Sequence, residues 1–193
     1  MIRHIDAFLN YLTVERSISP NTLSAYSNDL YQLNEYLFAN FGNSENGVMP
    51  AQITEELLVQ YALYLGSLGY AHSTRARKIA STKALFSFFL EEGVVDIDPS
   101  RSLTSPRLGR SLPDVLTVCE TTKLVEAPLQ QEWTPESCRD QAMLEVLYGA
   151  GIRVTELVSL NIEDLDLERG TVWCFGKGSR ERMVIFGIPA KKA

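Results

Sequence analysis

The sequence predicts a mainly α-helical protein whose C-terminal part is α+β and contains a β-hairpin. Three observations indicate this fold class. Apolar residues recur at spacings of three and four through the first hundred residues, which is typical of amphipathic helices. A stretch rich in proline, serine and arginine follows without periodicity, and short β-prone runs flank a glycine-rich turn near the end. The 193 residues are enough for two small domains with apolar cores.

The first hundred residues contain four segments with helical spacing. Ser19 and Pro20 are typical of an N-cap and a first helical position, and Thr54 is placed to cap the third segment. The fourth segment starts near Ser73 and stops at Gly93. The residues expected to be buried are Ile2, Ile5, Phe8, Leu9 and Leu12; Leu23, Tyr26, Leu30, Leu33 and Leu37; Leu58, Tyr61, Ala62 and Leu65; and Ile79, Leu85, Phe86, Phe89 and Leu90. These stripes predict a four-helix domain over residues 1–100.

The stretch "SRSLTSPRLGRSLP" has prolines, serines and arginines but no apolar stripe, which is typical of an interdomain linker. We place this linker at residues 101–113 and a second domain at 114–193.

The second domain is expected to open with helices near 117–127 and 136–148, followed by a helix that carries Arg153. Apolar residues from Val154 to Leu160 suit a helix that packs inward. The runs "TVWCF" and "RMVIFG" flank "GKGSRE", which predicts a hairpin with Lys177 near its tip.

The formal net charge of −6 is unevenly distributed. Residues 71–113 carry seven basic and four acidic groups, whereas the segments on both sides are net acidic. Between Ala71 and Leu90 there are four basic residues and no acidic one. Such a stripe can bind the phosphates of nucleic acid even in an acidic protein. A solvated basic helix face is the alternative.

Cysteine usage and hydropathy exclude several classes of protein. The three cysteines, Cys119, Cys138 and Cys174, are far apart and form no metal-binding spacing. The N-terminal residues lack the apolar core of a signal peptide, and no apolar run is long enough to span a bilayer. We therefore expect a cytoplasmic protein with reduced thiols, no cofactor, no metal and no membrane contact.

Two nucleotide-binding motifs are incomplete. "GAGIRV" lacks the third glycine of a dinucleotide fingerprint, and "GTVWCFGKG" has the wrong glycine spacing and no Ser/Thr for a P-loop. The only histidines, His4 and His72, precede the linker, so the second domain has none for acid–base catalysis. It does have Arg153, which matches phosphate oxygens, and Lys177, which can donate a proton to a leaving oxygen.

Arg153 and Glu156 are three residues apart, so a simple ion pair on a helix surface is an alternative interpretation. The arginine–lysine combination instead suits phosphoryl transfer at a DNA backbone without metal.

The stretch from "LYGAGIRVTELVSLNIEDLDLERG" to "GKGSRERMVIFG" resembles the first half of the catalytic domain of tyrosine recombinases, closest to bacterial Xer-type enzymes and phage-type integrases. "SPNTLSAYSNDLYQLNEYL" and "STRARKIASTKALFSFFLEEG" resemble their helical, SAM-like core-binding domain, and "SPRLGRSLPDVL" resembles their linker. The resemblance covers nearly the whole chain. It implies a C-shaped clamp on double-stranded DNA and site-specific recombination through a 3′-phosphotyrosine intermediate.

The resemblance also implies individual roles. Arg153 matches the first catalytic arginine, Glu156 the acidic residue that supports it, and Lys177 the hairpin lysine that protonates the leaving 5′ oxygen. In the helical domain, the residues that match the DNA-contacting stretch are Ser73, Thr74, Arg77, Lys78 and Lys83. Each is a solvated surface residue in the alternative interpretation, Lys78 most of all.

The resemblance also requires, further along the chain than the hairpin, an H-x-x-R motif and a tyrosine nucleophile, and neither follows the hairpin in these 193 residues. We therefore expect a truncated recombinase that is inactive by itself and monomeric, whereas the full-length protein forms tetramers on DNA with copies of itself or a paralogous recombinase. Two other functions stay open: a DNA-binding regulator or recombinase relic that never cleaves, and a helical protein–protein module favoured by the acidic total.

Overall fold

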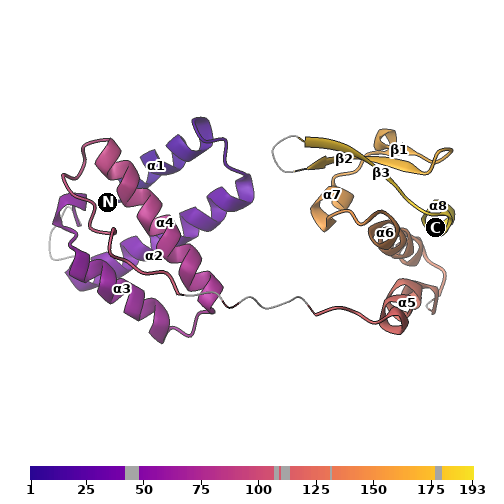
Figure 1. Cartoon of the computed structure of the whole chain (residues 1–193), viewed down its shortest axis with the longest axis horizontal. Helices are drawn as coiled ribbons and strands as arrows, with labels where there is room; N and C mark the ends of the chain where they lie inside the picture. Colours follow the sequence, from indigo (N-terminus) through magenta and orange to yellow (C-terminus); the bar gives the residue numbers. More distant parts are fainter. Residues whose placement is uncertain (42–47, 107–108, 110–113, 131, 177–179) are drawn as a thin grey trace. The chain divides into compact units, whose positions relative to one another are not determined.

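The computed structural model describes residues 1–41, 48–106, 109, 114–130, 132–176 and 180–193. The chain divides into two compact units, Met1–Ser111 (unit 1) and Leu112–Ala193 (unit 2). Figure 1 shows the helices of unit 1 and the mixed helices and strands of unit 2. The expected fold class, mainly helical with a small antiparallel sheet, is confirmed.

The described part of unit 1 contains four α-helices and one short 3₁₀ helix, with bounds α1 Ile2–Val14, α2 Pro20–Phe41, η1 Pro50–Gln52, α3 Glu55–Ser67 and α4 His72–Glu91. Pro20 is the first residue of α2, and the Ser19 hydroxyl accepts a bond from the backbone N–H of Thr22 at 3.4 Å. Thr54 stands at the N-cap of α3, although its hydroxyl accepts no backbone bond there. The helix starts were therefore well predicted by capping residues.

The core of unit 1 is built around α4, which packs against α1, α2 and α3. Phe8, Leu33, Leu58 and Phe86 are among its fully buried side chains, as the apolar stripes predict. The predicted burial of Ile2 is wrong, because it is 51% exposed at the start of α1. The predicted burial of Leu90 is also wrong, because it is 44% exposed in the last turn of α4. At that end of the helix the apolar stripe extends beyond the surface covered by the other helices.

Unit 2 consists of α5 Val118–Glu126, η2 Ala127–Gln130, α6 Pro135–Ala150, α7 Val154–Val158, η3 Ile162–Asp164, β1 Leu165–Asp166, β2 Thr171–Gly176, β3 Arg180–Ile185 and α8 Ile188–Lys192. The strands form an antiparallel sheet in the order β1-β2-β3, with Trp173 opposite Met183. The predicted hairpin is present, but Lys177 lies outside the described residues.

One face of the sheet supplies the core of unit 2. Val172 and Cys174 of β2 are buried with Ile152 and Phe186.

The expectation that the apolar residues from Val154 to Leu160 pack inward is only partly right. Leu157 and Leu160 pack against the core, whereas Val154 and Val158 are exposed. Val154 and Val158 are four residues apart and therefore lie on the same face of α7, which is turned to solvent, whereas Glu156 is buried.

Among the described residues, no helix combines the length and the apolar character needed to cross a membrane.

Candidate functional site

Arg153 is held at the junction between two helices of unit 2. α6 ends at Ala150, and Gly151 follows with φ 59°, a left-handed conformation that glycine adopts without steric cost. Ile152 is buried and anchors the connection, and Arg153 then occupies the N-cap of α7 in extended conformation. Its side chain is 70% exposed. The local sequence thus fixes the backbone of Arg153 and leaves most of its guanidinium open to solvent.

The carboxylate of Glu156 is buried beside this junction and accepts bonds from two arginines. The backbone N–H of Arg153 donates to Oε2 at 2.7 Å, and its Nη1 donates to Oε1 at 2.9 Å. Arg182 of β3 donates through both terminal nitrogens, at 2.7 Å to Oε1 and 2.8 Å to Oε2. These bonds, with Arg182 first and the Arg153 backbone next, lower the pKa of Glu156 from 4.5 to about 2.

The structure therefore brings Arg153 and Glu156 together, but the pair is not the simple ion pair on a helix surface that the sequence also allowed. A surface contact between residues three apart stabilises a helix only slightly. Here Glu156 is a buried carboxylate whose bidentate partner, Arg182, comes from the hairpin. The ion pair connects the Arg153 junction to the strand that follows residues 177–179.

Arg182 was missed by the sequence reasoning, although a signal was present. It faces the same side of the sheet as Val184, and it lies opposite the buried Cys174. An arginine on the inner face of a half-buried strand needs a carboxylate partner. Glu156 is the partner, but it lies 26 positions away in the sequence, so no local pattern showed the pair.

We predict that Glu156→Gln lowers the stability of unit 2 at neutral pH and that the deficit disappears in acid. Because the folded-state pKa is depressed to about 2, the contribution of the carboxylate is fully present above about pH 4.5 and is lost as the pH falls towards 2. Thermal unfolding of both proteins between pH 7 and pH 2 measures this. Glu163→Gln, at an exposed glutamate, is the control and should show no such pH-dependent gap. A deficit of constant size down to pH 2 would contradict the assignment.

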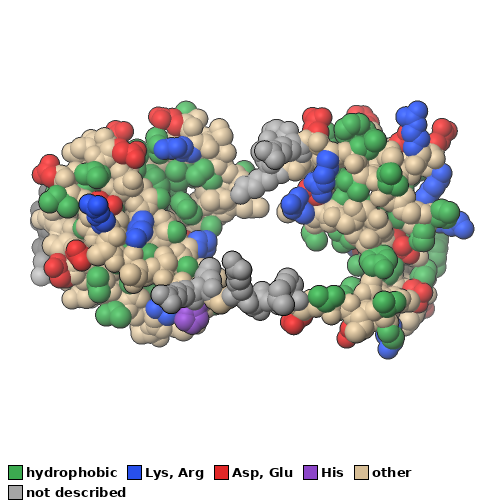
Figure 2. Space-filling view, in the orientation of Figure 1, with side chains coloured by type: hydrophobic (Ala, Val, Ile, Leu, Met, Phe, Trp, Pro, Cys, Tyr) green, Lys and Arg blue, Asp and Glu red, His purple; other side chains and the backbone are tan. Residues whose placement is uncertain are grey.

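The DNA-contact stretch predicted from the sequence lies on α4. Ser73 is exposed in its first turn, and Thr74, Arg77 and Lys83 are half-buried along the helix. Lys78 is buried, with its side chain only 7% exposed, so the solvated-surface alternative is wrong for this residue. Figure 2 shows basic side chains at separate points on the drawn face of unit 1 rather than in one continuous patch. A contact between this face and DNA would therefore depend on individual basic side chains and not on one extended basic surface.

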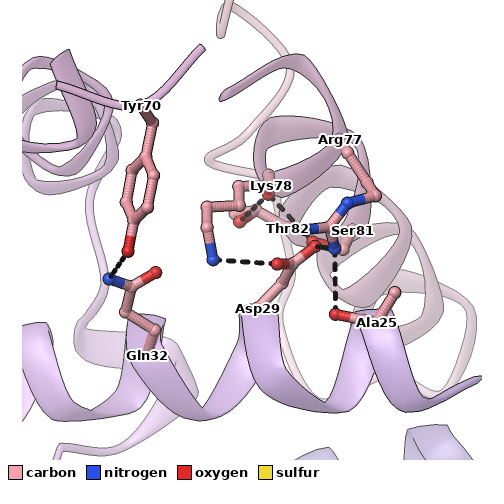
Figure 3. Close-up of polar contacts among 8 residues, drawn as sticks. All are labelled: Ala25, Asp29, Gln32, Tyr70, Arg77, Lys78, Ser81 and Thr82. Carbon is pink, nitrogen blue, oxygen red and sulfur yellow. Dashed lines mark hydrogen bonds and ion pairs between the residues drawn. The ribbon is translucent and has the colours of Figure 1, made fainter. Parts of the chain in front are cut away.

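Arg77 and Lys78 converge on one residue of α2 that the sequence reasoning did not identify. The ammonium of Lys78 donates to Oδ1 of Asp29 at 2.9 Å, and Nη1 of Arg77 donates to Oδ2 (Figure 3). Asp29 is 1% exposed. It is buried on α2 together with Leu30 and Leu33, in surroundings where a carboxylate requires cationic partners. An aspartate beside the apolar stripe of this helix was the feature of the sequence from which the buried ion pair could have been predicted.

Residues 114–193 match the phage integrase family, and residues 5–93 match the N-terminal SAM-like domain of phage integrases. The chain belongs to the phage integrase family, as the motifs indicated.

Its relatives include Xer tyrosine recombinases. The chain is 40% identical to tyrosine recombinase XerC of Roseiflexus castenholzii over 184 residues, which cover 95% of this chain and 57% of that protein. It is 36% identical over 193 residues to XerC of Pelotomaculum thermopropionicum, covering 100% and 62%. It is 37% identical over 187 residues to XerD of Oceanobacillus iheyensis, covering 97% and 61%. The chain thus spans less than two thirds of the length of these relatives.

Solved structures share the fold. A lambda integrase (residues 75–356) dimer bound to a COC′ core site superposes with a TM-score of 0.74 at 15% identity, covering 99% of this chain and 64% of that one. The Tn1549 transposon integrase in complex with circular intermediate DNA gives a TM-score of 0.66 at 16% identity, covering 98% and 62%.

Proposed function

We propose that these 193 residues are the part of a site-specific tyrosine recombinase that contacts duplex DNA and supplies the first catalytic arginine. The observation that carries this proposal is the anchoring of Arg153, whose backbone N–H and Nη1 are bonded to Glu156 while the side chain is 70% exposed. An arginine fixed at one end and open at the other is suited to an anion from outside the protein. Membership of the phage integrase family supports the scissile phosphate of DNA as that anion.

In the proposed reaction, a tyrosine from the part of the protein beyond these residues attacks the phosphate. Charge builds up on the non-bridging oxygens, and the guanidinium of Arg153 binds it more tightly in the transition state than in the ground state. Glu156 supports Arg153, and Lys177 protonates the leaving 5′ oxygen. None of these roles requires a metal ion or a cofactor.

We further propose that unit 1 grips the DNA backbone through α4, by way of Ser73, Thr74, Arg77 and Lys83. Lys78, the fifth residue of the predicted set, is left out because it is buried and paired with Asp29. Three other basic residues and no acidic one between Ala71 and Leu90 support this assignment. Two integrases that share this fold support it as well: the lambda integrase is bound to a COC′ core site, and the Tn1549 integrase is in complex with circular intermediate DNA. In the complete protein we expect recombinase tetramers on DNA, in the cytoplasm, and a monomer for these 193 residues alone.

Neutralising Arg77 and Lys83 together (R77Q/K83Q) is expected to weaken binding to duplex DNA and to flatten its salt dependence. Each lost phosphate contact removes about one unit from the slope of log affinity against log salt. Affinity is measured by fluorescence anisotropy across a salt series at low ionic strength. K191Q/K192Q, which removes the same charge from α8 of unit 2, is the matched control and should keep the wild-type slope. The assignment of α4 fails if R77Q/K83Q has the wild-type affinity and slope.

A further inference from the structure

Asp29 has more cationic partners than its own charge requires. It receives the ammonium of Lys78, the Nη1 of Arg77 and, at 3.3 Å, the hydroxyl of Ser81, all from α4 (Figure 3). The cluster therefore has one carboxylate and two cations, a net charge of +1. A structural ion pair between two helices would need only one of the cations.

The two cations occupy different environments. Lys78 is 7% exposed, and its ammonium also lies 5.3 Å from the centre of the Tyr70 ring, so it neutralises Asp29 from inside the protein. Arg77 is 41% exposed. Lys78 is thus sufficient to compensate the buried carboxylate, and the charge of Arg77 is the excess that the cluster presents to solvent.

Arg77 is fixed by only one end of its guanidinium. Nη1 donates to Asp29 and, at 3.0 Å, to the carbonyl of Ala25, so α2 holds that nitrogen in place. Among the described residues, Nε and Nη2 bond no protein acceptor. They form the edge of the fork that suits bidentate binding to a phosphate.

We propose that Asp29 is a positioning residue for DNA recognition: from α2 it orients the guanidinium of Arg77 on α4 towards a backbone phosphate, while Lys78 neutralises it from within. This inference rests on the proposed function, because it assumes that α4 meets DNA. An arginine already held in its bound orientation loses less side-chain entropy on binding than a free one. The arrangement raises affinity without adding a contact to DNA.

The test compares K78M with D29N/K78M, because net charge and positioning predict opposite orders of affinity. D29N/K78M has one more positive charge than K78M, so net charge alone would make it the tighter binder. Positioning predicts the reverse: K78M keeps the Asp29–Arg77 bond, whereas D29N/K78M weakens duplex-DNA binding by about threefold to tenfold relative to K78M. Thermal unfolding of both proteins confirms that they are folded at the assay temperature, and an unrelated duplex at low salt is the probe.

A third protein shows whether Asp29 acts through Arg77. Removing Asp29 and Lys78 from a chain without the guanidinium (D29N/K78M/R77Q) should leave the affinity within about twofold of R77Q alone, because coupled residues are not additive. Equal or tighter binding by D29N/K78M than by K78M overturns the positioning role.

The inference stays testable if D29N/K78M does not fold or if the wild-type chain does not bind DNA. If D29N/K78M does not fold, the Nε–Hε group of Arg77 in the wild-type chain is observed by NMR: a rigid group in the absence of DNA supports the inference, and a freely moving group overturns it. If the wild-type chain binds no duplex DNA at all, the proposed function of α4 fails and the inference falls with it. If the wild-type chain binds DNA and K78M and D29N/K78M bind it equally well, the positioning role of Asp29 is wrong but the proposed function of α4 stands.

Discussion

Arg153→Ala is expected to reduce DNA strand cleavage by about three orders of magnitude while changing DNA affinity little, because an arginine that acts mainly in the transition state affects rate more than binding. The experiment requires these 193 residues joined to the C-terminal part of a Xer relative, for example XerC of Pelotomaculum thermopropionicum, which matches the chain over its full length. Covalent protein–DNA adducts on nicked duplexes, formed without added metal, are measured by gel electrophoresis.

The control for that experiment is Arg169→Ala. Arg169 lies in the loop between β1 and β2, and its side chain is 84% exposed, so the variant removes the same charge from unit 2. It should cleave at close to the wild-type rate. Near-normal cleavage by Arg153→Ala would contradict the assignment of the catalytic arginine. The 193 residues alone should form no adduct, because the family's tyrosine motif does not occur in them.

Asp29→Ala is expected to destabilise unit 1 by about 3–5 kcal/mol, because it leaves the buried ammonium of Lys78 without its carboxylate. Lys78 is 7% exposed, so water cannot replace the lost partner without local rearrangement. Urea unfolding followed by a signal from unit 1 measures the change.

The double variant D29A/K78M removes both buried charges and should regain most of the lost stability, since replacing a buried pair by apolar groups is often nearly neutral. The account of the cluster is wrong if Asp29→Ala is as stable as the wild type. It is also wrong if adding K78M to Asp29→Ala restores nothing.

Much of the fold was predictable because helical periodicity and capping are local properties of the sequence. Ser19 and Pro20 marked the start of α2, and Phe8 and Phe86 were correctly expected in the core. The errors occurred where burial depends on what the rest of the chain covers. Leu90 has the right spacing but lies beyond the packed part of α4. Val154 and Val158 are four residues apart, so they share one face of α7, and that face is turned to solvent while Glu156 is buried.

The candidate site was predictable only in part, for the same reason. Arg153 and Glu156 are close in sequence, so their pairing was visible as a pattern. The bidentate bond from Arg182 and the contact between Asp29 and Arg77 join residues on different elements, 26 and 48 positions apart. Such pairs become apparent only when the strands and helices are placed. The two missed residues, Asp29 and Arg182, are charged but stand at positions that the apolar periodicity assigns to the core. A charged residue at such a position indicates a partner of opposite charge elsewhere in the fold.

The central claim, that α4 and the Arg153 junction face duplex DNA, is tested most directly by an NMR titration of the ¹⁵N-labelled 193-residue chain with a duplex at low salt. We predict that amide shifts concentrate in the first turns of α4, around Ser73 and Arg77, and near Arg153, and that raising the salt reverses them. The absence of shifts, or shifts confined to α1, α3 and α8, would contradict the claim.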